Sequence, residues 1–293
     1  MLNCFLYHLS SGHAWFSCGT IFLVILALDQ RGLFSSRPKL ARVARILLLS
    51  SLCVATATAT PVSLWLAVPL VLSCLAYAFA GFASRSLRLR RTSGLIAGGF
   101  VIVALVFELP YHLVRPPRSP PPEHVYVVAD SLAAGLGGEK MTWPRRLAEL
   151  SGVEVRDLSF PGANARSALR QQIPKIARDV DAEVRVLISI GGNDMLGPTS
   201  PAEFAENLDH LLAEARGDPR HPRTVLMLEL PLIPGAWQFA AHQRRLAAVH
   251  GVVLIPKRLM AGVILDEADV LDGLHLSPAG HERMARELVE WVR

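Results

Sequence analysis

Apolar residues are concentrated in the first third of the chain. No charged residue occurs from position 46 to position 84, and one helix of that length would extend about 58 Å, nearly twice the hydrocarbon core of a bilayer at about 30 Å. The run must therefore fold back on itself, and Thr60-Pro61 is the natural turn. The pattern predicts two membrane-spanning helices, over 46–59 and 62–83.

Two more apolar segments, 11–28 and 93–107, flank this pair, so we expect four transmembrane helices within residues 1–114. The alternatives are a cleaved signal peptide for the first segment and buried helices of a soluble protein for the others. A signal peptide begins with a positively charged region, whereas no Lys or Arg precedes Arg31. The length of the charge-free run argues against soluble helices.

From residue 124 the pattern changes to short apolar runs that alternate with amphipathic segments. Strands are predicted over 125–128, 153–158, 184–190, 224–230 and 252–255. Helices are predicted between and after them, over 143–150, 165–177, 201–215, 236–249 and 278–292. This alternation predicts an α/β domain over 124–293, with a parallel five-stranded sheet and helices on both faces.

A proline-rich stretch, 115–123, separates the two regions and favours extended polyproline conformation. At about 3.1 Å per residue it reaches at most about 28 Å, which would keep the α/β domain close to the bilayer. A linker without functional consequence fits the same composition.

Basic residues orient the predicted helices. They fall into two connections, after the first and third segments: Arg31, Arg37, Lys39, Arg42 and Arg45, then Arg85, Arg88, Arg90 and Arg91. Both connections are expected on the cytoplasmic side. The N-terminus and the turn at 59–61 carry no charged side chain and are expected outside. Four crossings then leave the C-terminal domain facing the periplasm or the cell exterior.

The same residues account for the isoelectric point of about 9.3. Residues 29–91 hold nine basic side chains and one acidic one, whereas the rest of the chain has 21 basic and 24 acidic side chains. The charge therefore reports membrane topology, and no nucleic-acid partner is expected. The four cysteines lie in or beside the apolar segments and indicate neither a disulfide framework nor a metal–thiolate site.

Three short fragments supply complementary chemical groups at the predicted strand ends. Ser131 follows the first strand, Asn193 the third, and Asp272 and His275 precede the last helix. Because the carboxyl ends of parallel strands meet at one edge of a sheet, we expect these groups to converge. A hydroxyl, an amide, and an imidazole with a nearby carboxylate are the groups that acyl transfer through a serine ester requires. Singly, the serine would be interpreted as an N-cap and the Gly-Gly-Asn-Asp segment as an ordinary turn.

The order Ser, Asn, then Asp-x-x-His resembles the SGNH or GDSL hydrolase family of esterases, lipases and thioesterases, over roughly residues 124–293. The resemblance implies a three-layer, flavodoxin-like domain. It implies Ser131 as nucleophile, His275 as general base and Asp272 as the carboxylate that orients it. It also implies an oxyanion hole made by the Ser131 and Gly162 backbone N–H groups and the Asn193 amide. Neither a metal nor an organic cofactor is implied.

One position departs from the family pattern, because Ala129 stands where the family has glycine. We expect the methyl group to be tolerated if the backbone there is neither left-handed nor crowded. Asp130 and Asp194 are interpreted as structural residues that hold loops through backbone hydrogen bonds. His281 is expected on the surface of the last helix, and no zinc site with His275 is expected.

The acyl pocket is the least defined part of the prediction. Ile233, Trp237 and Phe239 follow the fourth strand and are candidate lining residues, and Met195 and Leu196 follow Asn193. Core packing explains such residues equally well.

The sequence thus predicts a membrane-anchored serine esterase whose substrates are lipid, aryl or acylated-glycan esters. One alternative is an acyltransferase, in which a sugar or lipid hydroxyl takes the acyl group from the serine. Another is a catalytically silent envelope protein that only binds, although intact Ser131, Asp272 and His275 argue against it.

Overall fold

The computed structural model describes residues 2–34, 36–58, 60–83, 87–136, 141–176, 183–218, 221–231, 233 and 235–293. The chain forms two compact units. Gly12–Leu113 is the helical unit, and Met1–Ser11 together with Val114–Arg293 is the α/β unit.

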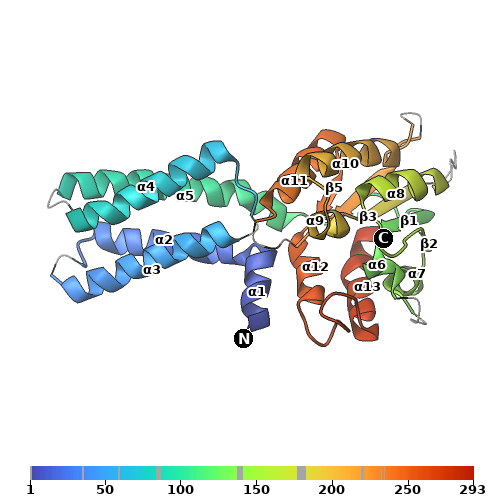
Figure 1. Cartoon of the computed structure of the whole chain (residues 1–293), viewed down its shortest axis with the longest axis horizontal. Coiled ribbons are helices and arrows are strands. Elements are labelled where there is room, and N and C mark those ends of the chain that lie inside the picture. The colour runs from blue at the N-terminus through green and yellow to red at the C-terminus, as the bar shows by residue number, and fades with distance from the viewer. Residues whose placement is uncertain are drawn as a thin grey trace. The chain divides into compact units, whose positions relative to one another are not determined.

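Four long helices form the helical unit: α2 (His13–Gln30), α3 (Pro38–Ala57), α4 (Leu64–Ala83) and α5 (Leu87–Leu113). Figure 1 shows α2 beside α3 and α4 beside α5. Of the described helices, two are apolar over a length that could cross a membrane, His13–Gln30 and Arg88–Leu113, and a shorter apolar stretch covers Leu64–Ala80. A helix is present at each of the four predicted spans, and α3 carries Lys39, Arg42 and Arg45 in its first two turns.

A buried carboxylate joins three of these helices. Asp29, near the end of α2, accepts hydrogen bonds from the Tyr77 hydroxyl of α4 at 2.7 Å and from Nε of Arg90 in α5 at 2.9 Å. Because the Asp29 side chain is nearly inaccessible to solvent, these two donors replace its lost hydration.

Two residues of the topology prediction, Ala59 and Arg85, lie outside the described residues.

The N-terminus differs from the grouping of residues 1–114 expected from sequence. A separate helix, α1 (Leu2–Ser11), precedes α2 and packs against α12 (Lys257–Ile264) of the α/β unit. Gly12 separates α1 from α2 with φ of +84°, a left-handed conformation that glycine adopts without strain. The first predicted span began at Ser11, and the sequence analysis assigned no helix to the residues before it.

The α/β unit is built on a parallel sheet with strand order β2-β1-β3-β4-β5. Its strands are β1 (His124–Ala129), β2 (Glu154–Asp157), β3 (Val184–Ser189), β4 (Thr224–Leu228) and β5 (Val253–Ile255). The parallel five-stranded sheet expected from sequence is confirmed, with strand ends that differ by at most two residues. β1 and β3 are fully in register, from His124 opposite Val184 to Ala129 opposite Ser189.

Helices cover both faces of the sheet. They are α6 (Ser131–Ala134), α7 (Trp143–Ser151), α8 (Ala165–Gln171), a 3₁₀ turn (Ile173–Lys175), α9 (Gly192–Leu196), α10 (Pro201–Ala215), α11 (Trp237–His250), α12 and α13 (Pro278–Val292). Alternate residues of β1 point to opposite faces. Val125 and Val127 pack in the cluster formed with α7, α12 and α13, and Figure 1 shows α8, α10 and α11 across the sheet. The sequence analysis did not predict α12, which follows β5 after one residue and has no side-chain cap.

The proline-rich stretch is fastened to the α/β unit. The buried Arg185 guanidinium, on β3, donates to the Ser119 hydroxyl at 2.7 Å and to the Pro120 carbonyl at 2.9 Å. It also donates to the Arg293 carbonyl at the chain end, at 2.7 Å. Since this cation is bound by oxygen atoms of two distant segments, it holds the linker and the end of α13 against the sheet.

Candidate active site

The turn after β1 presents Ser131 at the start of α6. Asp130 caps this short helix, because its Oδ1 accepts the Leu132 backbone N–H at 3.0 Å. Ala129, at the position where the family pattern has glycine, is the last residue of β1, and no described non-glycine residue has a positive φ. The expectation that the alanine methyl is tolerated is therefore confirmed for the backbone conformation.

A continuous set of hydrogen bonds leads from the serine to a carboxylate. His275 Nε2 lies 3.2 Å from Ser131 Oγ, and His275 Nδ1 lies 2.7 Å from Asp272 Oδ2. The other carboxylate oxygen of Asp272 accepts the backbone N–H groups of His275 at 2.8 Å and Leu274 at 3.0 Å. The backbone bond from His275 lowers the pKa of Asp272 most, followed by the imidazole and by the Leu274 N–H. Asp272 therefore stays ionised at neutral pH, and an ionised partner holds the imidazole with Nε2 towards the serine.

The loop that carries Asp272 and His275 is braced at both ends. Ser277 caps α13 by accepting the Gly280 N–H at 3.2 Å, and its own hydroxyl donates to the Ala268 carbonyl at 2.9 Å. A Cβ at Gly280 would lie 2.0 Å from the Asp269 carbonyl oxygen, so this close approach requires glycine. Arg283 of α13 donates to Asp269 at 2.6 Å. The loop is thus attached to a long buried helix.

The third fragment places an amide beside the nucleophile turn. Asn193 lies in α9, and its Nδ2 donates to the Ala163 carbonyl at 2.9 Å and to Asp130 Oδ2 at 3.4 Å. Gly191, just before α9, has φ of +120°, and a Cβ there would lie 2.8 Å from Leu230 Cδ1. Both the backbone conformation and the packing therefore require glycine at this turn. Gly162 precedes Ala163, is exposed and has φ of +76°.

Two buried carboxylates join the loops around this amide. Asp194 Oδ2 accepts the Ala165 N–H at 2.9 Å, and Asp130 bonds Leu132 and Asn193 as described. The structural role expected for both residues is confirmed by these hydrogen bonds. Burial raises the pKa of Asp130 to about 6, and burial also raises the pKa of Asp194.

His281 is not a surface residue, contrary to the expectation from sequence. Its side chain is 1% exposed, and Nδ1 accepts the backbone N–H of Trp143 at 3.1 Å. Trp143 is the first residue of α7, where a helix leaves N–H groups without internal partners. His281 thus supplies a hydrogen-bond acceptor to the first N–H group of α7. The packing of α13 against α7 buries this side chain, and the spacing between His275 and His281 gives no sign of that packing.

The candidate pocket residues differ in how far they are exposed to solvent. Phe239 is 7% exposed and its ring centroid lies 5.2 Å from that of Phe204, so it packs in the core. Trp237 and Met195 are half-buried, whereas Leu196 and Ile233 are exposed.

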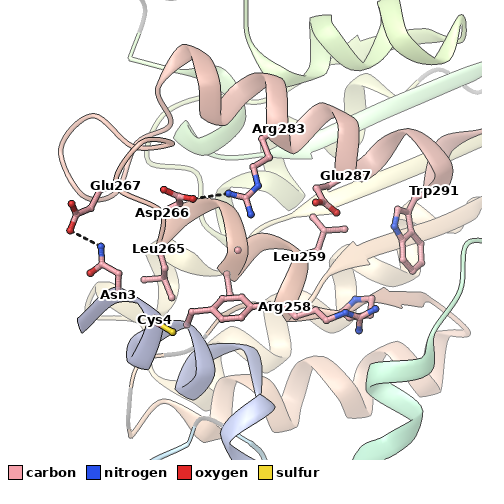
Figure 2. Close-up of a pocket in the computed structure, with 14 residues that line it drawn as sticks. Asn3, Cys4, Arg258, Leu259, Leu265, Asp266, Glu267, Arg283, Glu287 and Trp291 are labelled. Atoms are coloured by element: carbon pink, nitrogen blue, oxygen red, sulfur yellow. Dashed lines mark hydrogen bonds and ion pairs between the residues drawn. The ribbon is translucent and has the colours of Figure 1, made fainter. Parts of the chain in front are cut away.

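A separate cavity of about 880 Å³ lies between α1, α12 and α13 (Figure 2). Its lining includes none of the five residues predicted for the triad and the oxyanion hole. At one end Asn3 of α1 donates to Glu267 at 2.7 Å, and nearby Arg283 donates to Asp266 at 3.0 Å, as the dashed lines in Figure 2 show. Sequence reasoning missed the Asn3–Glu267 contact, because it joins segments near opposite ends of the chain.

Comparison with known proteins identifies the family of this chain. The model of the GDSL-like lipase/acylhydrolase family matches residues 130–283, more than half of the chain, and a search of curated proteins found no match. Among solved structures, the psychrotrophic esterase EstA from Pseudoalteromonas sp. is 18% identical with a TM-score of 0.51, over 58% of this chain and 96% of EstA, a likeness that supports the fold.

Two further solved structures are similar to this chain. TesA is 27% identical with a TM-score of 0.48, over 56% of this chain and 95% of its own. The lipase/acylhydrolase from Enterococcus faecalis is 21% identical with a TM-score of 0.44, over 57% of this chain and 93% of its own. The family match includes Ser131, Asn193, Asp272 and His275. The chain therefore belongs to the GDSL-like lipase/acylhydrolase family and is a serine hydrolase that acts on ester bonds.

Proposed function

We propose that Ser131, His275 and Asp272 are the catalytic triad of a membrane-anchored esterase. The hydrogen bonds of 3.2 Å and 2.7 Å that link the three side chains carry this proposal. Ser131 Oγ forms a bond to the ester carbonyl carbon while its proton passes to His275 Nε2. His275 then gives this proton to the departing alkoxide as the ester C–O bond breaks. Water, deprotonated by the same imidazole, attacks the acyl carbon. The bond from that carbon to Ser131 Oγ breaks, His275 returns the proton to Oγ, and the carboxylic acid leaves.

The negative charge on the carbonyl oxygen is stabilised by three donors in this proposal: the Ser131 N–H, the Gly162 N–H and the Asn193 amide. The bond from Asn193 to the Ala163 carbonyl supports it, because that bond uses one N–H of the amide and holds it next to Gly162. In this proposal the second N–H, which faces Asp130 at 3.4 Å, turns to the oxyanion. One such donor contributes about 2.7–4 kcal/mol to lowering the barrier.

The helical unit is the membrane anchor, with all four helices spanning the bilayer. Its support is the large number of apolar side chains exposed on the outer surface of the unit while a second apolar set fills its core. A soluble protein rarely leaves such a surface uncovered, whereas lipid covers it readily. Examples from each helix are Ile21, Val24, Ile46, Leu47, Trp65, Val68, Leu72, Ile102, Val106 and Phe107.

The topology proposed is a triad domain in the periplasm or at the cell exterior. Besides the basic connections, the packing of α1 supports it. Because α1 precedes the first span and packs in the α/β unit, both must lie on one side of the membrane, which requires an even number of crossings. Lipid, aryl or acylated-glycan esters on that side are the candidate substrates.

Labelling with a fluorophosphonate tests the proposed nucleophile. The full chain should be used in membranes, since α1 and the linker are both part of the α/β unit. We expect labelling of the wild type, none of Ser131→Ala, and wild-type labelling of Ser151→Ala, whose hydroxyl accepts the Val153 N–H at the end of α7. Labelling that persists in Ser131→Ala would contradict the assignment.

A further inference from the structure

Exposed apolar side chains gather on the loops that carry the proposed active site. Among the described residues of 114–293, seven large apolar side chains are exposed. Six of them, 40% to 57% exposed, form what we call the apolar rim: Leu136, Met141, Leu196, Ile233, Leu271 and Leu274. The seventh, Val249, is 64% exposed and lies near the end of α11.

The rim residues share one edge of the sheet. Leu136 and Met141 lie between β1 and α7, Leu196 ends α9 after β3, and Ile233 lies between β4 and α11. In a parallel sheet these connections all leave the carboxyl ends of the strands. α11 runs back from that edge, so Val249 lies at the opposite one.

Contacts already described bring these loops together around the nucleophile. The His275–Ser131 bond joins the loop of Leu271 and Leu274 to the turn after β1. The Asn193–Asp130 bond joins α9, which Leu196 ends, to the same turn. An ester carbonyl within reach of Ser131 is therefore surrounded by loops that carry exposed apolar side chains.

Polar groups next to the nucleophile are already engaged. The Asp272 carboxylate accepts two backbone N–H groups and the imidazole, and the buried Asp130 accepts the Leu132 N–H. In the loop before α13, Asp266 and Glu267 are exposed but bound to Arg283 and Asn3. Among the described residues of these loops, the rim supplies the large exposed apolar side chains.

We infer that the apolar rim binds the acyl chain of the substrate, so that the site acts on esters of medium- or long-chain carboxylic acids in preference to acetyl esters. This inference rests on the proposed esterase function. A methylene transferred fully out of water raises the binding constant about fourfold. For an acyl chain that lies half-buried on the rim, each methylene therefore raises the binding constant about twofold. The preference should therefore grow steadily with chain length.

The test compares kcat/KM for p-nitrophenyl acetate, butyrate, hexanoate and octanoate, each kept below its aggregation limit, with the full chain in lipid nanodiscs. We expect the octanoate-to-acetate ratio of the wild type to be at least about tenfold. Leu136→Ser, Leu196→Ser and Leu271→Ser should each lower that ratio by about twofold to fivefold, and the triple variant by more. Val249→Ser, with an equally exposed residue at the opposite edge, should leave it unchanged.

Three outcomes are distinguishable. A flat chain-length profile with hydrolysis that still depends on Ser131 would overturn the inference alone, and would fit a rim that docks a protein or a second copy of the chain. A preference for octanoate that the triple variant retains would overturn it too. Absence of Ser131-dependent hydrolysis of every ester would instead overturn the proposed function.

Discussion

The side-chain amide of Asn193 lies 3.4 Å from Oδ2 of Asp130, the residue just before the nucleophile. The other oxygen of Asp130 caps α6 through the Leu132 N–H at 3.0 Å. One buried carboxylate therefore positions both the turn that presents Ser131 and the amide that we propose as an oxyanion donor. This arrangement connects the chemistry of the site to the ionisation of Asp130.

Replacing Asp130 should change how stability depends on pH. Burial raises the pKa of Asp130 to about 6, compared with about 4 in an unfolded chain. The folded state then binds the proton more tightly, so this group makes the free energy of unfolding fall as pH rises from about 4 to about 6, by at most about 3 kcal/mol. We expect Asp130→Asn to lose this part of the dependence in melting temperatures measured from pH 4 to 7. Glu214→Gln, exposed on α10, is the control, and an Asp130→Asn curve parallel to the wild type would contradict the argument.

Asp272→Asn should abolish activity with little loss of stability. The asparagine carbonyl can still accept the N–H groups of Leu274 and His275, but its NH₂ group would face Nδ1 and favour the wrong imidazole tautomer. We expect kcat to fall by roughly 10³–10⁴. The wild-type carboxylate has a lowered pKa, so its ionised form stabilises the folded loop fully above about pH 4. This contribution to the stability is lost as the pH falls further. Activity of Asp272→Asn within tenfold of the wild type at pH 7 to 8 would argue against the triad.

Arg185→Met should destabilise the α/β unit. The variant leaves the carbonyl groups of Ser119, Pro120 and Arg293 without their charged donor. Buried acceptors left unsatisfied cost about 1–3 kcal/mol each, so we expect a total loss of about 2–4 kcal/mol. Denaturant titration of the full chain measures it, and Arg286→Met, which alters a largely exposed arginine on α13, should cost less than about 0.5 kcal/mol. Equal stability of the two variants would show that the linker is not held as described.

The free thiol of Cys4 reports the side on which α1 lies. Cys4 is exposed and lines the cavity between α1 and α12, whereas Cys18 and Cys74 are buried in the helical unit. Cys53 is exposed on α3, where the proposed anchor would turn it to lipid, out of reach of a water-soluble reagent. With the topology proposed, a membrane-impermeant maleimide added to intact right-side-out membrane vesicles should label the full chain but not Cys4→Ser. Labelling of Cys4 only after permeabilisation would place α1 in the cytoplasm and rule out this topology.

The sheet and the convergence of the triad could be predicted because both follow local rules. Short apolar runs gave the five parallel strands, and strand ends gather at one edge whatever the details of packing. The buried His281, the core position of Phe239 and the packing of α1 could not be predicted, since each depends on which distant helix covers it. Of the apolar rim, Leu196 and Ile233 were named as pocket candidates. The other four residues were not, because an apolar residue in a loop reveals its exposure only when the neighbouring loops are in place.

The central claim is that acyl transfer passes through Ser131, and mass spectrometry of the acyl-enzyme tests it most directly. The full chain is mixed with p-nitrophenyl acetate, quenched in acid during the first turnover and digested. We predict one acetyl group on the peptide that contains Ser131, and neither this adduct nor turnover in Ser131→Ala. An acetyl group on another residue, or turnover by Ser131→Ala at the wild-type rate, would contradict the account.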